Sequence, residues 1–548
     1  MPGAQVIEKP TWQQLSADPP DNEMPTRPTL PLGVLIATVA TVAAGVAWAL
    51  VRPPVADMAA QVFRAKLFEQ SGYQIWNGQW YGGHHLPGYS LLMPPIGGAV
   101  GAWWAGCIAA AAASVGMAVL ARACTRTTRG TVGITVLLDI GVIASLLSGR
   151  TTWLLGVSFA SVSIAALIRG KGAVAVATAL LSPLASPVAA MFLALIAAAA
   201  AIKRERRVLG ALVIVAATLP GVLFAFIFPE GGSQPFPATS FVPMTLAVAF
   251  LLAILPASKP DLRFGVGLYL LLLVATLVIS SPIGSNAVRL GQISGPAVVA
   301  LAFAFAGGMR LTTRRRALFA TAFAAMVILQ WIQPIRDVMH ARIDATTNPE
   351  FHQPLIEEVK SLGGAPGRIE ILWTRGHWED AYVAPEIPMA RGWERQLDRR
   401  FNNAVSQPKL SEATFNRWLD SLAVRWVAVP NAPIDGSVKG EELLLERGTS
   451  RLDAIWQNPD WKLFAVRNPQ SLASGPATAT QLRSREVLLD FRRPGTALVR
   501  VRWSRWWRLQ GVTVCLEPSR SGMTLVHATR SGLARLVITD LTGGPSCE

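Results

Sequence analysis

Apolar runs of about twenty residues, separated by short polar stretches, follow one another from residue 31 to residue 335. Runs of this length with few charged residues are typical of membrane-spanning helices. We predict about eleven spans, at residues 31–51, 101–121, 130–148, 152–168, 173–186, 188–202, 208–228, 244–257, 264–281, 297–309 and 317–335. This part of the chain is therefore predicted to be a polytopic helical membrane domain.

Two consecutive predicted spans share one short segment. The segment between Lys171 and Lys203 holds about thirty residues, too few for two full crossings at about 1.5 Å per residue. Pro183 and Pro187 interrupt it. We expect two half-length or re-entrant helices inside the bundle, where neighbouring helices rather than lipid surround the turn.

A long polar segment, residues 52–95, follows the first span. Its length and its content of charged, aromatic and histidine residues set it apart from a simple connection. Asp57, Gln61 and Arg64 recur at helical spacing, so a short helix would carry all three on one face. We predict a polar helix at the membrane surface, backed by the aromatic residues that follow it, as a site for a lipid-linked or interfacial substrate.

The pattern becomes that of a soluble protein after residue 335. Helix-like runs alternate with short apolar runs over residues 354–470, which indicates an α/β arrangement, and alternating apolar and polar positions over 478–543 indicate a β-sandwich. The predicted organisation is a disordered cytoplasmic tail (1–30), a transmembrane domain (31–335), an extracytoplasmic α/β domain (336–475) and an extracytoplasmic β-sandwich (476–548).

Composition agrees with this organisation. The chain is 51% hydrophobic with a mean hydropathy of +0.38, as expected for a membrane protein with a soluble portion. The formal net charge of +16 lies mostly before residue 336, in short loops between apolar runs. A nucleic-acid-binding protein would gather such charge on one continuous face, so no nucleic-acid partner is predicted.

Alternate loops differ sharply in charge, which predicts the orientation. One set carries Arg122, Arg126, Arg129, Arg169, Lys171, Lys203, Arg204, Arg206, Arg207, Lys259, Arg263, Arg310, Arg314, Arg315 and Arg316. The other set has only Arg52, Arg64, Lys66, Arg150 and Arg289. Basic loops face the cytoplasm, so we predict a plasma-membrane protein with its N terminus inside and its long first loop and C-terminal part outside.

Four groups in or beside the spans are candidates for chemistry. Asp57, just outside the first span, could act as a general base on a sugar hydroxyl, or could instead cap the following helix. Arg150, Asn286 and Arg289 lie in outer loops. The two arginines could hold a lipid phosphate by paired hydrogen bonds, or merely extend to the interface.

Asp139 lies within a predicted span, where a carboxylate marks either function or a helix–helix hydrogen bond. His84 and His85 could bind phosphate or a divalent ion, although a surface turn is the simpler interpretation. No Cys/His spacing matches a metal site, so no metal ligand and no cofactor is assigned and a divalent cation is left open.

Tryptophans beside charged residues recur in the first loop and the soluble part, at Trp76, Trp80, His377, Trp378 and Trp393. Such clusters hold glycans in many proteins, but they also join domains, and we favour the second interpretation. Cys515 and Cys547 could form a disulfide in an oxidising compartment. No Walker A loop, dinucleotide fingerprint or nucleophile elbow occurs in the sequence.

Several segments together resemble an actinobacterial multi-pass membrane family related to YfhO-type proteins and, more distantly, to GT-C glycosyltransferases. These segments are ADMAAQVFRA, WYGGHHLPGYSLLMPP, SGRTTWLLG, LLSPLASPVA, FPEGGSQPF, SNAVRLG, GHWEDAYVAPEIPMARGWERQLD and WKLFAVR. The resemblance implies a GT-C-like fold in which an acidic residue of the first outer loop is the catalytic base, the position that Asp57 occupies. Arg150 and Arg289 are candidates for the donor phosphate by their location in outer loops alone. Asp57 stands alone here, without the paired Asp-Asp or Asp-Glu of several GT-C families.

We therefore predict a membrane glycosyltransferase for cell-wall assembly that moves a sugar from a polyprenyl-phosphate donor to an envelope glycan or lipid acceptor outside the membrane. Asp57 is the predicted base. The residues predicted to bind substrate or phosphate are Arg64, His84, His85, Arg150, Asn286 and Arg289. Two alternatives remain: a non-catalytic envelope scaffold that binds glycans, and a lipid-linked sugar flippase that uses Asp139 and the broken helix pair.

Overall fold

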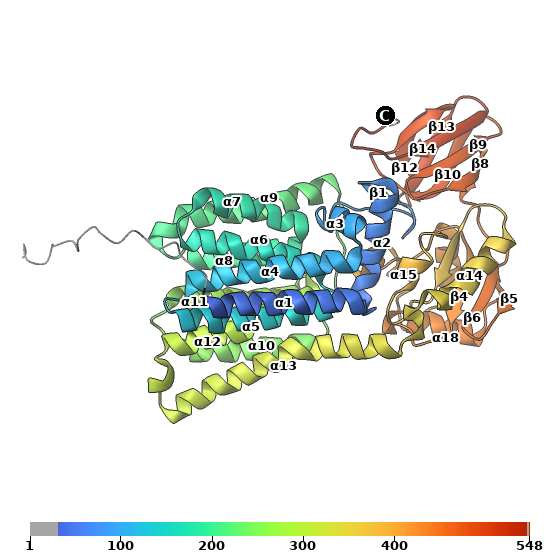
Figure 1. Ribbon diagram of the computed structural model, residues 1–548. Coiled ribbons are helices and arrows are strands. Elements are labelled where there is room, and N and C mark those ends of the chain that lie inside the picture. The colour runs from blue at the N-terminus through green and yellow to red at the C-terminus, as the bar shows by residue number, and fades with distance from the viewer. Residues whose placement is uncertain (1–30, 545–546, 548) are drawn as a thin grey trace, which may run out of the picture.

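The computed structural model describes residues 31–544 and Cys547. The predicted tail, residues 1–30, lies outside the described residues. A helical bundle occupies one end of the molecule and the C-terminal α/β and β-rich parts the other (Figure 1). The predicted fold class, a polytopic helical membrane protein with α/β and β-sandwich parts at its C-terminal end, is confirmed.

Eight helices of the described chain are long and apolar enough to cross a membrane. They are α1 (Leu32–Val51), α4 (Ala102–Cys124), α5 (Thr128–Leu147), α6 (Thr151–Ile168), α9 (Arg207–Ile227), α11 (Pro260–Val278), α12 (Arg289–Phe305) and α13 (Thr313–Ile343). Three shorter apolar helices are α7 (Gly172–Ala185), α8 (Pro187–Ala200) and α10 (Ala238–Ile254). Each predicted span overlaps one of these helices; how many of the short ones cross fully stays a prediction.

The break between α7 and α8 has the predicted cause. Ser186 is extended, with φ −157° and ψ 113°, and Pro187 starts α8. A proline at the first helical position needs no hydrogen-bonded N–H, so it begins a helix readily but cannot continue the preceding one. The two helices of 14 residues each are half-length elements, as expected from the sequence.

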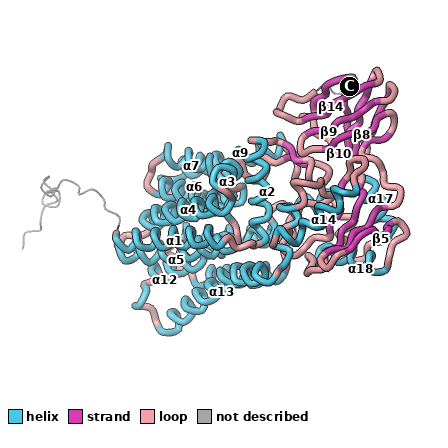
Figure 2. Tube along the Cα trace, turned by 45° about the vertical axis from the view of Figure 1, so that its right-hand side comes forward, coloured by secondary structure: helices cyan, strands magenta, loops and turns pink. Residues whose placement is uncertain are grey.

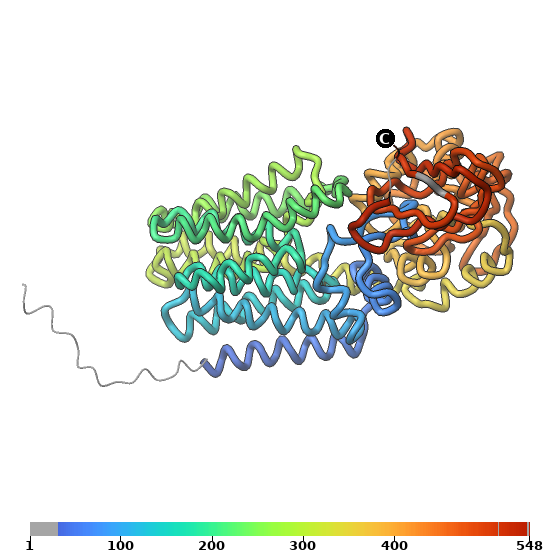
Figure 3. The backbone as a smooth tube through the Cα atoms, turned by 90° about the horizontal axis from the view of Figure 1, so that it is seen from above, coloured from blue at the N-terminus to red at the C-terminus, as the bar shows by residue number. Residues whose placement is uncertain are grey.

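The first loop is folded throughout. It contains α2 (Ala56–Ser71), a two-stranded ribbon of β1 (Trp76–Asn77) and β2 (His84–His85), and α3 (Met93–Val100). The ribbon is antiparallel, with Trp76 opposite His85. In two views α2 lies between the helical bundle and the C-terminal part (Figures 1 and 3). The loop is therefore the contact layer between the membrane helices and the rest of the protein.

The soluble α/β part is built on a four-stranded sheet in the order β3-β4-β6-β5. Its strands are β3 (Arg368–Ile371), β4 (Val424–Pro430), β5 (Leu452–Gln457) and β6 (Trp461–Val466). Its helices are α14 (Pro349–Leu362), α15 (Glu379–Tyr382), α16 (Arg395–Phe401), α17 (Glu412–Ser421) and α18 (Lys439–Arg447). Only β3 and β4 pair in parallel, because α17 lies in the long connection between them.

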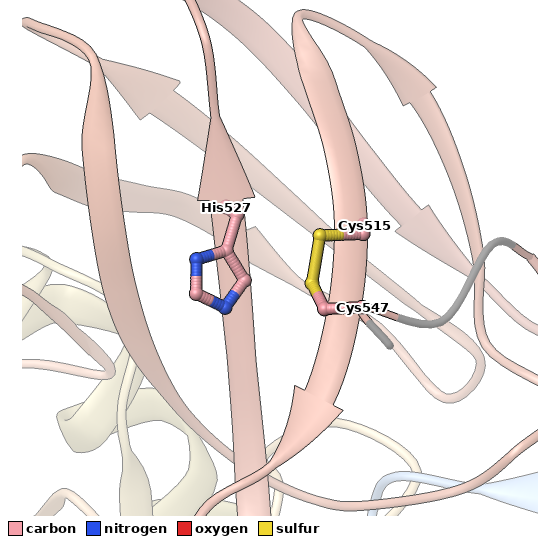
Figure 4. Close-up of side chains that lie close together, drawn as sticks. All are labelled: Cys515, His527 and Cys547. Carbon is pink, nitrogen blue, oxygen red and sulfur yellow. A yellow bond between two sulfur atoms is a disulfide. The ribbon is translucent and has the colours of Figure 1, made fainter.

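The last part is a sandwich of two four-stranded antiparallel sheets, β12-β13-β10-β7 and β11-β14-β9-β8. The strands are β7 (Ala473–Ser474), β8 (Ala477–Leu482), β9 (Glu486–Phe491), β10 (Gly495–Arg502), β11 (Arg508–Gly511), β12 (Thr513–Pro518), β13 (Met523–Ala528) and β14 (Gly532–Val537). The strands of the four-stranded sheets lie at the end of the molecule away from the helical bundle (Figure 2). Cys515 and Cys547 form a disulfide beside His527, which ties the end of the chain to β12 (Figure 4).

Candidate functional site

Asp57 lies in the first turn of α2, where the chain leaves the membrane. One carboxylate oxygen is 3.8 Å from Nη2 of Arg289, and the carboxylate is 31% exposed. The helix N-cap is Val55, and it has no side-chain cap. The alternative that Asp57 merely caps the helix is therefore wrong: its side chain faces a cation instead.

Two tryptophans of the soluble part hold the backbone just before Asp57. The indole N–H of Trp378 donates to the carbonyl oxygen of Pro54 at 2.8 Å, and that of Trp393 to the carbonyl oxygen of Ala56 at 3.0 Å. The first carbonyl lies just before α2 and the second belongs to its first residue, so the two bonds fix the position of the first turn. The soluble part thus helps to place Asp57.

A tight turn before α6 brings Arg150 to the same place. Gly149 has φ +72°, which side-chain-bearing residues rarely adopt, and a Cβ there would lie 2.9 Å from Val55 and 3.0 Å from Met58. The turn thus packs directly on the start of α2. Arg150 follows it and donates from Nη1 to Oε1 of Gln292 on α12 at 2.6 Å.

A second carboxylate, Asp337, lies close to Arg150 and Asp57 near the C-terminal end of α13. Nε2 of Gln333 donates to one of its oxygens at 2.7 Å, and Gln330, one turn earlier, donates to the backbone of Gln292 at 2.8 Å. Sequence reasoning missed Gln292, Gln333 and Asp337. The spacing of polar residues in QWIQPIRD was the available signal, because positions 330, 333 and 337 share one helix face.

Two like charges meet in this cluster of Asp57, Arg150, Arg289, Gln292 and Asp337, which we call the outer cluster. Burial and the neighbouring charge of Arg289 together lower the pKa of Arg150 to about 10, although the charges of Asp57 and Asp337 act in the opposite direction. Arg150 is still a cation at neutral pH. Two guanidinium groups near each other and two carboxylates form a nearly neutral set that an incoming anion can rearrange.

Arg64 lies two turns along α2 from Asp57 and has another partner. Its Nη2 is 2.5 Å from Oε1 of Glu394, and both side chains are buried. Its guanidinium stacks 3.7 Å from the ring of Tyr89, whereas Nε and Nη1 have no hydrogen-bond partner among the described residues. Arg64 also lines a shallow hollow formed by the first loop. The structure therefore separates Arg64 from the outer cluster.

His84 and His85 are not a surface turn. His84 is fully buried and stacks on Trp80 with ring centres 5.7 Å apart, and burial lowers its pKa to about 3. A neutral, enclosed imidazole of this kind has no access to a phosphate, so the predicted binding role of His84 is corrected. It is a core residue of the first loop.

His85 joins three parts of the molecule. Its Nδ1 is 2.5 Å from Oε1 of Glu230, in the loop between α9 and α10, and its Nε2 is 2.9 Å from the Ser504 hydroxyl of the sandwich. Burial alone would raise the pKa of Glu230, but the hydrogen bond and charge of His85 hold it below its usual value. With both ring nitrogens engaged, His85 links these three parts, and its predicted phosphate role stays a prediction.

The tryptophan clusters also belong to the protein core. Trp76, Trp80 and Trp378 are 0–2% exposed. A ring buried to this extent offers no face to a sugar, so the predicted glycan-binding role is corrected for these three residues. His377 is buried too, and Trp393 is engaged by Ala56. The preferred interpretation, that these side chains join the parts of the protein, matches their contacts.

The remaining two candidates lie apart from these contacts. Asn286 sits in the 3-10 turn Gly284–Val288 just before Arg289, and its side chain makes no hydrogen bond to any described residue. Asp139 is buried on α5, and neither of its carboxylate oxygens has a hydrogen-bond partner within the described chain. Neither residue is joined to Asp57 by a contact in the structure.

No protein-family model matches the sequence, and no curated protein matches it. Among solved structures, the chain is similar to the apo oligosaccharyltransferase of Archaeoglobus fulgidus, with 11% identity over 72% of this chain and 69% of that chain and a TM-score of 0.47. The archaeal oligosaccharyltransferase AglB from the same organism, in complex with an inhibitory peptide and a dolichol-phosphate, has 11% identity, the same coverage and a TM-score of 0.45.

ArnT from Cupriavidus metallidurans bound to undecaprenyl phosphate is also similar, with 13% identity over 80% of this chain and 99% of that chain and a TM-score of 0.39. At these identities and TM-scores the similarities assign neither a family nor an activity to this chain. Its function has to follow from the geometry of the outer cluster.

Proposed function

We propose that this protein is a membrane glycosyltransferase that moves a sugar from a polyprenyl-phosphate donor to a cell-envelope acceptor on the outer side, with Asp57 as general base. The observation that carries the proposal is the meeting of Asp57 with Arg150 and Arg289 where α2, α6 and α12 leave the bundle. A base and two phosphate-binding cations are the groups that this transfer needs, and here they are within reach of one another.

The proposed reaction is a single displacement. The Asp57 carboxylate accepts the proton of an acceptor hydroxyl as its oxygen forms a bond to the anomeric carbon of the donor sugar. The bond from that carbon to the phosphate oxygen breaks, and its electron pair leaves with the lipid phosphate. Arg150 and Arg289 stabilise the charge that develops there, and the anomeric configuration is inverted.

The geometry explains how Asp57 can face both partners. Its carboxylate is partly exposed, so an acceptor has access, and its 3.8 Å approach to Arg289 leaves room for a phosphate oxygen to compete for that guanidinium. Gln292 accepts a hydrogen bond from Arg150, and the nearby charge of Asp337 favours the cationic form of that guanidinium. Polar groups on three helices thereby hold the two guanidinium groups through contacts that a phosphate can replace.

One observation favours a second candidate function. Asp139 lies inside the bundle with both carboxylate oxygens unpartnered among the described residues. A lipid-linked sugar flippase could use such a group as a moving ion or proton site together with the broken α7–α8 pair. This function predicts that Asp139→Asn stops lipid translocation, whereas the proposed transferase predicts little effect on sugar transfer.

The decisive experiment uses the full chain in lipid nanodiscs with a panel of polyprenyl-phosphate sugars and envelope glycan or lipid acceptors. Asp57→Asn keeps the shape of the side chain and removes the base, so we expect transfer to fall about 100-fold or more. Glu69→Gln, a change at an exposed carboxylate of the same helix, is the matched control. Transfer that persists in Asp57→Asn would remove Asp57 from the reaction, and no transfer with any donor would overturn the enzyme.

A further inference from the structure

A buried group of three potential metal ligands lies in the soluble part, away from the residues of the outer cluster. His377, Glu379 and Asp380 each bring a nitrogen or oxygen ligand atom to within 4.8 Å of the others, and all three residues are buried. They lie at the turn into α15, in the sequence His-Trp-Glu-Asp. Ligand atoms bound to one cation at about 2.0–2.2 Å lie at most about 4.4 Å apart, so only small side-chain movements separate this group from a shared ion.

The surroundings of Asp380 indicate that its carboxylate binds a cation. It is 0% exposed, and neither carboxylate oxygen has a hydrogen-bond partner among the described residues. An ionised carboxylate without a partner is very costly in a protein interior, so buried acids are paired, bound to metal or neutralised by a proton. The positive charge of Arg64 favours the ionised form of Asp380, yet the guanidinium of Arg64 is paired with Glu394.

Hydrogen-bonding neighbours orient His377 and Glu379 in the way that metal ligands are usually oriented. Nε2 of His377 faces Oδ2 of Asp435 at 3.5 Å, while its Nδ1 is buried and unpartnered within the described chain. A proton on Nε2 leaves the Nδ1 lone pair free, which is the arrangement of carboxylate–histidine–metal sites. Glu379 accepts hydrogen bonds from the backbone N–H and the hydroxyl of Thr374 at 3.0 and 2.6 Å, which fixes its carboxylate.

We infer that His377, Glu379 and Asp380 bind a divalent transition-metal cation, with Zn²⁺ as the best match. One imidazole nitrogen and two carboxylates suit zinc, whereas Mg²⁺ and Ca²⁺ prefer oxygen ligands alone. A dication would compensate the two buried carboxylates, and His377 would bind through Nδ1. The inference does not depend on the proposed transferase activity.

The second His/Cys group of the described chain does not compete with this site. Cys515, His527 and Cys547 are also close together, but the two sulfur atoms are joined in a disulfide and offer no thiolate (Figure 4). His527 instead contacts the hydroxyl of Thr496 at 2.8 Å and Glu517 at 3.1 Å. A metal in the native protein is therefore expected at His377 rather than in the sandwich.

The site would have a structural consequence for the first loop. Trp378 lies between the first two ligands in sequence, and its indole donates to Pro54 just before α2. A cation that fixes residues 377–380 therefore also fixes the tryptophan that holds the start of α2. Loss of the cation should loosen the joint between the soluble part and the membrane helices.

The test measures metal in the full-length, tag-free protein purified in detergent. We expect about one Zn²⁺ per chain by elemental analysis, a fall of at least tenfold in Asp380→Asn, and no change in Asp453→Asn, which alters an exposed carboxylate of the same part. Chelator treatment should lower the Tm of the native chain, Zn²⁺ alone should restore it, and Asp380→Asn should show neither effect.

Asparagine also imitates a protonated aspartate, which makes the opposite result informative. Burial, with the charge of Glu379, raises the pKa of Asp380 well above its usual range, so a neutral acid is the competing explanation. A native chain without metal, no Tm response to Zn²⁺ and an undiminished Tm in Asp380→Asn would overturn the site. Should Asp380→Asn fail to fold, the Zn²⁺ titration is carried out on the chelator-treated native chain and on His377→Gln. A Tm that rises with Zn²⁺ in the native chain and not in His377→Gln would support the site, and no rise in the native chain would overturn it.

Discussion

Arg150 and Arg289 carry like charges at the end of an apolar bundle, an arrangement that only nearby anions make tolerable. Asp57 and Asp337 supply those anions in the protein itself, and Gln292 shares in holding Arg150. A carboxylate that pairs with an arginine can be displaced by a phosphate, which offers more oxygens to the same guanidinium. At the residue scale, the outer cluster is thus suited to exchange one anion for another.

The first prediction concerns Arg150. Arg150→Gln removes a charge-assisted contact worth about 1.5–3 kcal/mol, so the KM for the lipid donor should rise about tenfold to a hundredfold. Arg150→Lys should recover only part of this, because lysine keeps the charge and loses the planar fork. Donor titrations of sugar transfer measure it. An unchanged KM in Arg150→Gln would separate Arg150 from the donor phosphate.

The second prediction concerns the dependence of stability on acid. Burial holds the pKa of His84 at about 3, so between pH 6.5 and 3 the unfolded chain binds a proton that the folded chain does not. The free energy of unfolding should therefore fall as the pH falls through this window, by at most about 1.4 kcal/mol per pH unit from this residue. His352, with its pKa lowered to about 4 by burial, acts in the same direction.

His84→Phe keeps an aromatic ring against Trp80 and removes the titrating group. The variant should lose less stability on acidification than the native chain, and the two should have parallel profiles above pH 7. Thermal unfolding at pH 7.5, 6 and 5 gives the comparison. Equal loss in both chains would show that His84 is accessible and charged in the folded protein.

At the scale of elements, the turn at Gly149 connects α5 to α6 and packs on the start of α2, which is far away in the sequence. Its left-handed backbone and its contact with Val55 and Met58 leave no room for a side chain. Gly149→Ala should therefore cost about 1 kcal/mol or more and shift Arg150 away from Asp57. We expect a lower Tm together with a raised KM for the donor. Gly133, where a Cβ would meet nothing within 4 Å, provides a control that lowers neither.

The helices were predictable from the sequence because the hydrophobic pattern of each segment reflects the surroundings of that segment. Apolar length marks α1, α4 and the other spans, and a serine followed by a proline marks the break between α7 and α8. Period-two alternation likewise predicted the strands of the sandwich. These signals are local, and the structure preserves them.

The candidate site was predictable only in part, since it is assembled from distant segments. Asp57 and the two arginines could be selected as charged residues at outer ends of spans, but their proximity depends on tertiary packing. Asp337 was missed because it lies just past the last predicted span, where a charge looks like ordinary loop composition. The predicted surface position of His84 was wrong because a polar residue in a polar loop gives no sign that aromatic rings enclose it.

At the scale of the whole molecule, the first loop connects every part. Trp378 and Trp393 reach its start, Glu394 pairs with Arg64 in its middle, and His85 links it to Glu230 and to Ser504 of the sandwich. Figure 3 shows the loop running beside the C-terminal part. The soluble part is thus a support for α2, and through α2 for Asp57.

This arrangement makes the orientation of the protein a test of its proposed function. The basic loops predict the cytoplasmic side, and the Cys515–Cys547 disulfide fits an oxidising compartment for the C-terminal part. In a chain carrying Cys107→Ala and Cys124→Ser, a membrane-impermeant maleimide applied to whole cells should label Ser361→Cys and not Ser258→Cys. Permeabilised cells should label both, since both positions are exposed.

The opposite labelling would place Asp57 and the outer cluster in the cytoplasm. A transferase that acts on the cell envelope could not then use them, because lipid-linked donor and acceptor would meet on the other side of the membrane. The same result would also leave the disulfide in a reducing compartment, where such bonds are rare. Labelling at residue 361 alone instead puts the base, the two arginines and the C-terminal support on the one side where envelope acceptors are found.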